Sequence, residues 1–286
     1  MIDIKGCGRL IVISFAIVPI LPFLLNYLKF WLLIFSGVRM VDISDLSAVT
    51  RFSGCPQVVW CFWWQGAMNE NRLQSLEMMR KNLGVPVVLV GADNIGEYLV
   101  EGAPLHPAFS YLSDVHKSDY IRIYFLHHYG GGWHDIKPTG TSYFDAWDVF
   151  ADPDVYFLGK PEIEGGAAQV YDSQGNYMPS VWKDLVATNR WVGRAYTPMS
   201  YSLYESINAV LDAHLNKLSK YPARKAYSHV NDKYNSKWYR KLLGSQYPLQ
   251  WTLFGDVFHP LNYKFRNNVS RALPFDVVEN MGLAYR

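Results

Sequence analysis

The residues whose types could do chemistry are concentrated in one stretch, 118–137, with the sequence SDYIRIYFLHHYGGGWHDIK. Asp119 and Arg122 stand three residues apart, which puts both side chains on one face if the stretch begins as a helix. Three consecutive glycines at 130–132 then permit a sharp turn before the carboxylate of Asp135. If the two carboxylates and the guanidinium face one common site, that site suits a ligand that carries hydroxyl and phosphate groups.

The elements that must position these residues can be predicted from caps and periodicity. Ser113 is a suitable N-cap for a helix that runs to about residue 129, and Gly130 is placed to end it. Residues 133–136 then form a short apolar strand that ends beside Asp135.

Upstream, a strand, a helix and a second strand follow one another. The apolar run at 57–63 predicts a buried strand, the helical spacing at 72–83 predicts an amphipathic helix, and 85–90 predicts another strand. This order implies a right-handed crossover and a parallel sheet, which binds ligands beyond the carboxyl ends of its strands. Four residues should lie along that edge: Trp63, Trp64, Asp93 and Asn94.

Further elements follow downstream. Residues 155–158 and 185–188 predict strands, and Thr197 with Pro198 opens a helix with a long apolar stripe. The predicted fold class is therefore α/β, a single Rossmann-like domain with a mostly parallel sheet over 51–286.

The N-terminal part, 1–50, is predicted to be a hydrophobic membrane segment with a linker. Residues 10–28 contain no charged residue and would nearly cross a bilayer core of roughly 30 Å as a helix. Pro19 and Pro22 interrupt this segment, so a kinked span and an in-plane hairpin both fit. The alternative is a buried pair of N-terminal helices.

Composition excludes several classes of function. A net charge of +2 over 286 residues, with no long Lys/Arg block, argues against nucleic acid as a partner. Ten Trp and twenty Tyr suit either nucleobase and sugar contacts or a generous aromatic core.

Dinucleotide-binding, P-loop, zinc-protease and serine-hydrolase elbow motifs do not occur. The three cysteines lack disulfide or zinc spacing, which favours a reducing compartment.

The stretch 118–137 resembles the sugar-binding segment of family 32 glycosyltransferases and their bacterial relatives in capsular polysaccharide synthesis. In those families Ser-Asp-x-x-Arg, Tyr-Gly-Gly and Asp-x-Asp follow in this order. The segment 56–66, PQVVWCFWWQG, and the later WTLFGDVFHPL also resemble family motifs, so the resemblance extends over about 55–262. Each motif alone is weakly specific, but their order and spacing together are a strong signal.

The resemblance implies a glycosyltransferase-A fold, a nucleoside-diphosphate sugar as donor, with UDP expected, and transfer that retains anomeric configuration. Asp119, Arg122 and Asp135 are then the expected catalytic residues. Asp119 would bind donor-sugar hydroxyls, Arg122 the sugar or diphosphate, and Asp135 would be the first residue of the Asp-x-Asp pair. The expected donor-binding set is Trp63, Trp64, Asp119, Arg122, Gly131, Gly132, Asp135 and Lys137.

The chain departs from the family pattern at Lys137, which stands where the second aspartate of the pair usually holds a divalent metal. One reading keeps Mn²⁺ or Mg²⁺ on Asp135, with Asp256 and His259 as further candidate ligands. The other lets Lys137 itself supply positive charge to the diphosphate.

The expected function is transfer of a sugar to a glycan or lipid-linked acceptor in surface (capsular) polysaccharide synthesis. The expected location is the membrane, with the catalytic domain on the cytoplasmic face of a bacterial inner membrane, or in the Golgi if the source is eukaryotic. Two alternatives stay open: a nucleotide-sugar-binding protein that has lost transfer, and a membrane-anchored carbohydrate-binding module.

Overall fold

The computed structural model describes residues 49–64 and 66–275. The chain divides into two units, Met1–Asp42 and Ile43–Arg286, and every described residue belongs to the second unit. The predicted membrane segment at 10–28 therefore lies outside the described residues. Within 49–64 and 66–275, no helix combines the length and apolar character needed to cross a membrane.

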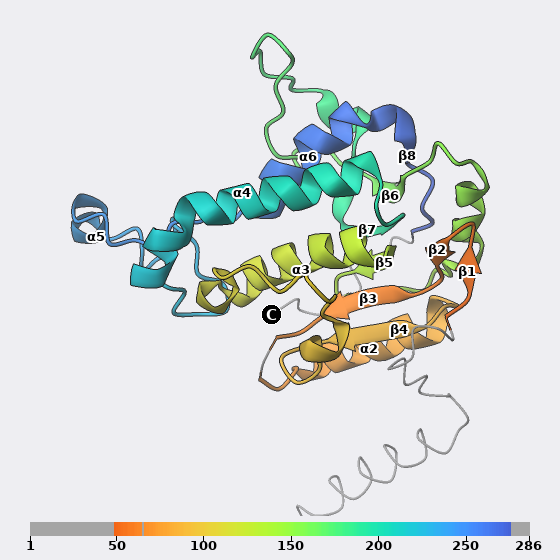
Figure 1. Cartoon of the computed structure of the whole chain (residues 1–286), viewed down its shortest axis with the longest axis horizontal. Coiled ribbons are helices and arrows are strands. Elements are labelled where there is room, and N and C mark those ends of the chain that lie inside the picture. Colours follow the sequence, from red (N-terminus) through yellow and green to blue (C-terminus); the bar gives the residue numbers. More distant parts are fainter. Residues whose placement is uncertain (1–48, 65, 276–286) are drawn as a thin grey trace, which may run out of the picture. The chain divides into compact units, whose positions relative to one another are not determined.

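A six-stranded sheet forms the centre of this unit (Figure 1). Strand β7 is antiparallel to both of its neighbours, and the other pairings are parallel. The predicted α/β class with a mostly parallel sheet is thus confirmed. In spatial order the strands are β4 (Val87–Val90), β3 (Val59–Phe62), β5 (Gly131–His134), β7 (Val186–Gly193), β6 (Phe157–Pro161) and β8 (Val269–Ser270). Strands β1 (Arg51–Phe52) and β2 (Cys55–Pro56) form a separate two-stranded ladder.

Helices cover both faces of the sheet (Figure 1). One apolar cluster joins the sheet to three helices, α3 (Asp114–His128), α4 (Pro198–Lys220) and α6 (Leu253–Lys264). A second cluster joins the opposite face to α2 (Glu70–Asn82) and the 3₁₀ helix η4 (Phe144–Ala151). The remaining helical segments are short: η2 (Ile95–Tyr98), η3 (Phe109–Tyr111), η5 (Val181–Asp184), α5 (Trp238–Leu242) and η6 (Arg266–Asn268).

Local capping interactions explain where the main helices begin. The Ser113 hydroxyl accepts from the backbone N–H of His116 at the start of α3, as predicted. Thr197 and Ser200 form a reciprocal capping box at the start of α4, with Pro198 in its first turn. Because each cap involves residues three apart, these boundaries can be predicted from sequence.

The strand predicted at 133–136 lies two residues earlier, because Gly131 and Gly132 enter the sheet as β5. A Cβ atom on Gly132 would lie 2.9 Å from Val59 Cγ2, so the missing side chain allows β5 to approach β3 closely. Gly130, with φ 71°, makes the turn after α3. The glycines therefore have two functions, a helix stop and a close strand contact.

Candidate functional site

Strands β3, β4 and β5 are mutually parallel, so their carboxyl ends lie at one edge of the sheet. Asp135 follows β5 directly at this edge. The antiparallel strand β7 begins there, and the Asp135 N–H donates to the Asn189 carbonyl at 2.9 Å. Helix α3 precedes β5 in the chain and packs on it, which brings Arg122 to the same place.

Arg122 is held by contacts from four parts of the chain. Its Nη1 donates to the Thr188 carbonyl at 3.0 Å, and its Nη2 donates to Ser118 Oγ at 3.2 Å. The guanidinium carbon lies 5.0 Å from the ring centre of Trp133 and 4.6 Å from that of Phe254. Hydrogen bonds and aromatic faces together fix the orientation of this cation.

Two carboxylates meet this guanidinium. Nη2 of Arg122 lies 3.4 Å from Asp119 Oδ1 and 3.6 Å from Asp135 Oδ1. The Trp133 indole N–H also donates to Asp135 Oδ1, at 3.1 Å. The Asp119 side chain is 7% exposed and that of Asp135 is 20% exposed, so Asp135 is the more accessible of the two. The structure therefore brings together the three residues predicted to be catalytic.

The environments of the two carboxylates push their pKa values apart. Burial raises the pKa of Asp119 to about 7, Arg122 opposes this shift, and the charge of Asp135 adds to it. Burial also acts to raise the pKa of Asp135, but the charges of Arg122 and Lys137 outweigh it and hold that pKa below its ordinary value. Near neutral pH the cluster thus contains an ionised Asp135 beside a carboxyl that readily binds a proton.

The positive charge of Lys137 lies close enough to Asp135 to lower the pKa of the Asp135 carboxyl. It is half-buried, two residues beyond Asp135 on the same segment. Together Arg122 and Lys137 surround the Asp135 carboxylate with positive charge, which suits a phosphate-bearing ligand at this edge.

The adjacent residues Trp63 and Trp64 turn to opposite faces of the sheet. Trp63 packs with the α2 cluster, where its indole N–H donates to the Gly66 carbonyl at 2.9 Å. Trp64 packs with the cluster that includes α3, and the Lys117 Nζ lies 4.8 Å from its ring centre. Only Trp64 is therefore on the same side of the sheet as Arg122.

Among the other predicted positions, Asn94 has a structural role, Asp93 is exposed and the two glycines lie away from Asp135. The Asn94 side chain closes a turn, since its oxygen accepts from the Gly91 N–H at 2.8 Å and its nitrogen donates to the Leu89 carbonyl at 2.9 Å. Asp93 is exposed at the same edge. Gly131 and Gly132 are buried at the start of β5, at the opposite end of that strand from Asp135.

Among the described residues, the candidate metal ligands Asp135, Asp256 and His259 do not belong to a group of three or more side chains that could hold a metal ion. His259 is 1% exposed, its Nδ1 accepts from the Ala168 N–H at 2.9 Å, and its Nε2 lies 3.3 Å from Glu162 Oε2. Asp256 is exposed and accepts from the Thr252 hydroxyl at 2.8 Å. In the part of the chain that the structure describes, no three His, Cys, Asp or Glu side chains are arranged to hold a metal ion.

Sequence reasoning missed the groups that hold Arg122. Thr188 contributes through its backbone carbonyl, and every residue type has one, so the sequence does not indicate this contact. Trp133 and Phe254 were both within motifs that the sequence singled out, but nothing in those motifs showed that their rings lie against the guanidinium. Ser118 carried a local signal, because it precedes Arg122 by one helical turn.

Comparison with known proteins gives one family match. Residues 44–166 match the family model described as "Capsular polysaccharide synthesis protein", a region that includes Asp119, Arg122 and Asp135. No curated protein matches the chain. Among solved structures, the chain is similar to one described as "PaToxG Glycosyltransferase", with a TM-score of 0.33 and 11% identity over 74% of this chain and 87% of that chain.

Proposed function

We propose that this chain is a glycosyltransferase that acts in surface polysaccharide synthesis. It moves a sugar from a nucleoside-diphosphate sugar, with UDP as the nucleotide, to a glycan or lipid-linked acceptor. The observation that carries the proposal is the Asp119–Arg122–Asp135 cluster at the carboxyl edge of the sheet. The match to a capsular polysaccharide synthesis model over 44–166 supports the same function, because the cluster lies within the matched region. The proposed location is the cytoplasmic face of a bacterial inner membrane.

Each member of the cluster has a role that its environment supports. Asp135, ionised and partly accessible, orients the donor sugar through its hydroxyl groups. Arg122 holds Asp135 in place and adds positive charge beside the diphosphate. Asp119 is more deeply buried, so it acts mainly by positioning Arg122. Trp64 is the proposed contact for the base or sugar ring, since it lies on the same side of the sheet.

The reaction that we propose retains anomeric configuration by front-face substitution. The acceptor hydroxyl oxygen forms a bond to the anomeric carbon while the bond from that carbon to the diphosphate oxygen breaks. The nucleoside diphosphate leaves with the bonding electron pair, and its phosphate oxygen takes the proton of the acceptor hydroxyl. Negative charge grows on the diphosphate during this step, so nearby cations lower the barrier.

Lys137 and Arg122 are the proposed source of that positive charge. The family resemblance implies Mn²⁺ or Mg²⁺. Our proposal of direct neutralisation is supported by two observations: no group of three or more His, Cys, Asp or Glu side chains in the described residues could hold a metal ion, and both ring nitrogens of His259 face other protein groups. A lysine in place of the second carboxylate fits direct charge neutralisation by the protein.

The test is a ligand screen followed by a turnover assay. UDP and UDP-sugars should raise the melting temperature of the full chain, because a ligand that binds only the folded state stabilises it. Release of UDP from the matching UDP-sugar should then be measurable, and more so with a glycan acceptor. The proposal fails if no nucleoside diphosphate stabilises the protein while glycans do, which would instead identify a carbohydrate-binding module.

A second candidate function, nucleotide-sugar binding without transfer, is motivated by Lys137 alone. It predicts the same thermal shifts with UDP-sugars but no release of UDP and no transfer. Turnover by the purified protein, abolished by Asp135→Asn, would exclude it.

A further inference from the structure

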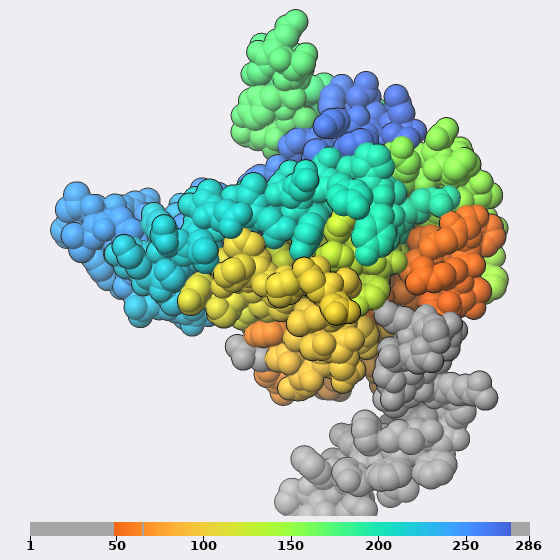
Figure 2. Space-filling model, in the orientation of Figure 1, coloured from red at the N-terminus to blue at the C-terminus, as the bar shows by residue number. Residues whose placement is uncertain are grey.

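Helix α5 carries an unusual concentration of exposed apolar side chains. Trp238, Leu242 and Leu243 are 75%, 76% and 71% exposed, the highest values among the large hydrophobic residues that the structure describes. Trp238 and Leu242 are four residues apart and share one face of α5. Figures 1 and 2 show this part of the chain, coloured blue, projecting from the body that contains the sheet. Such a patch marks a site of interaction.

The segment around this patch is strongly basic. Residues 217–250 contain eight Lys and Arg and one carboxylate, Asp232, although the whole chain has a net charge of only +2. Asp232 is itself engaged, since its side chain accepts from the N–H groups of His229, Tyr234 and Asn235. The cations are Lys217, Lys220, Arg224, Lys225, Lys233, Lys237, Arg240 and Lys241. These cations are spread along the segment, so the sequence contains no long consecutive block of Lys and Arg there.

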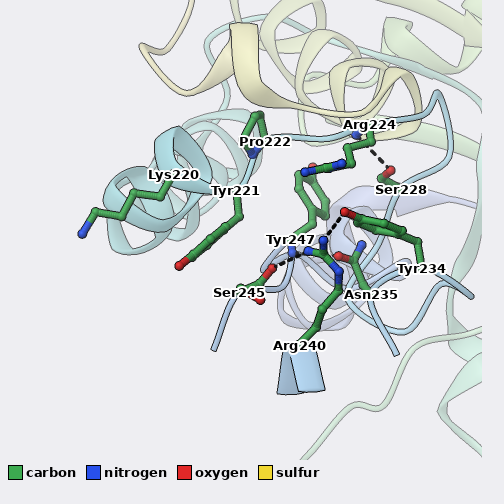
Figure 3. Close-up of a pocket in the computed structure, with 10 residues that line it drawn as sticks. All are labelled: Lys220, Tyr221, Pro222, Arg224, Ser228, Tyr234, Asn235, Arg240, Ser245 and Tyr247. Atoms are coloured by element: carbon green, nitrogen blue, oxygen red, sulfur yellow. Dashed lines mark hydrogen bonds between the residues drawn. The ribbon is translucent and has the colours of Figure 1, made fainter. Parts of the chain in front are cut away.

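A pocket lies beside α5, and its lining contains cations but no carboxylate (Figure 3). Arg240 points from α5 into the pocket, where its guanidinium carbon lies 3.8 Å from the ring centre of Tyr234 and its Nη1 donates to the Ser245 carbonyl at 3.0 Å. Arg224 lies 4.8 Å from the centre of the same ring. The Arg240 Nη2 also donates to the Tyr234 hydroxyl, so two guanidinium groups lie against one tyrosine ring in the lining of this pocket. A pocket with this lining suits an anion with several oxygens, such as a phosphate.

Arg240 projects from a different face of α5 than Trp238 and Leu242. Arg240 follows Trp238 by two residues, which is more than half a helical turn, so it faces the pocket while Trp238 faces outward. Exposed apolar side chains beside several cations are typical of a segment that lies against an anionic bilayer.

We propose that residues 217–250 form a membrane-docking site in which Trp238, Leu242 and Leu243 enter an anionic bilayer and the Arg224–Arg240 pocket receives a lipid headgroup phosphate. Charge complementarity favours this occupant over a second copy of the chain. A symmetric pair through this face would bring two strongly basic segments together. The proposal concerns a site separate from the Asp119–Arg122–Asp135 cluster and does not depend on transfer activity.

Docking at this face would also place the candidate active site close to the membrane. The pocket residue Tyr247 connects to the start of α3, because its hydroxyl accepts from the Ser113 N–H at 3.3 Å and lies 2.8 Å from His116 Nδ1. Lys117, the next residue, lies against Trp64. A lipid held in the pocket is therefore at the same end of α3 as Trp64.

The test uses the full chain with vesicles and an environment-sensitive fluorophore on one cysteine. Leu242→Cys carries the probe, and Leu73→Cys on α2, where Leu73 is 51% exposed, is the matched control. Cys7→Ser removes one native thiol. Cys55 and Cys61 are buried, and burial raises the pKa of their thiols to about 11 and about 12, so both react slowly.

We expect the emission at position 242 to shift to the blue with vesicles that contain about 30% phosphatidylglycerol, and the emission at position 73 to stay unchanged. Lys237→Gln and Lys241→Gln should each lower the ratio of docked to undocked protein about fivefold. Emission at position 242 unchanged from that in water would overturn the proposal. So would a shift that needs no vesicles and grows with protein concentration, which indicates self-association, or one that inorganic phosphate alone abolishes, which indicates a soluble anion.

Discussion

The carboxylates of Asp119 and Asp135 approach the same Nη2 atom of Arg122, at 3.4 and 3.6 Å. The two groups nevertheless differ in protonation, since the pKa of Asp119 is raised to about 7 and that of Asp135 is lowered. One guanidinium therefore neutralises mainly Asp135, and Asp119 stays close to the point where it gains a proton.

Asp135→Asn should lower release of UDP from the donor by roughly 100-fold or more, because the charge that orients the sugar is lost while the shape is retained. Asp148→Asn, at an exposed position on η4 and outside the predicted ligand edge, is the control and should leave the rate unchanged. Steady-state kinetics and circular dichroism of both variants check this. An Asp135→Asn variant with wild-type turnover would remove Asp135 from the site.

Arg122→Ala should lower the free energy of unfolding by about 1–3 kcal/mol, because it leaves the Thr188 carbonyl without its hydrogen bond and removes the cation beside Asp135. Arg122→Lys keeps a positive charge, but a lysine lacks the planar guanidinium that donates hydrogen bonds to both Thr188 and Ser118. We expect this variant to fold and to bind UDP at least tenfold more weakly, as measured by calorimetry. Wild-type affinity in Arg122→Lys would restrict Arg122 to a structural role.

The raised pKa of Asp119 predicts a specific pH dependence of stability. Because the folded state holds this proton more tightly than the unfolded state, the stability from neutral Asp119 is present below about pH 4 and is lost as the pH rises through about 7. Asp119→Asn cannot ionise, so its free energy of unfolding should rise relative to wild type between pH 4.5 and 7.5, by an amount on the order of 4 kcal/mol at most. Urea denaturation at several pH values measures this difference, and a constant difference across the range would contradict it.

Gly132→Ala should destabilise the fold by about 1–3 kcal/mol, since the added Cβ would lie 2.9 Å from Val59 Cγ2. Gly96→Ala is the control, because a Cβ there meets nothing within 4 Å. If Gly132 acts only in packing, the KM for the donor should not change in the folded fraction of Gly132→Ala. A raised KM with unchanged melting temperature would instead place Gly132 in the donor site.

Lys137→Asp should create a requirement for metal that the wild-type chain lacks. We expect UDP to stabilise wild-type protein equally with Mn²⁺ and with EDTA, because Arg122 and Lys137 supply the positive charge. In Lys137→Asp, stabilisation by UDP should depend on Mn²⁺, since two carboxylates would then flank the diphosphate. Lys137→Gln, which only removes the charge, is the comparison. Loss of the UDP-dependent shift when wild-type protein is treated with EDTA would show that it too uses a metal.

Interactions between residues close in sequence were predictable. Ser113 as the cap of α3, Gly130 as its end and Thr197 with Pro198 at the start of α4 all depend on contacts within a few residues. The alternation of apolar strands and helices predicted the parallel part of the sheet, and hence the edge at which Asp135 lies. The spacing of Asp119 and Arg122 predicted their ion pair, because a helix fixes that geometry.

The sequence by itself thus determined the α/β class, the limits of α3, the start of α4 and the membership of the charged cluster. Only the tertiary structure decided that Trp64 and not Trp63 lies on the side of Arg122, and that His259 turns to Glu162. It also decided that Lys220, Arg224 and Arg240, which are scattered in the sequence, line one pocket beside α5. The physical reason is that a strand's exact end, a helix's rotation and a loop's path are set by long-range packing, as in the bond from Arg122 to Thr188, which joins residues 66 positions apart.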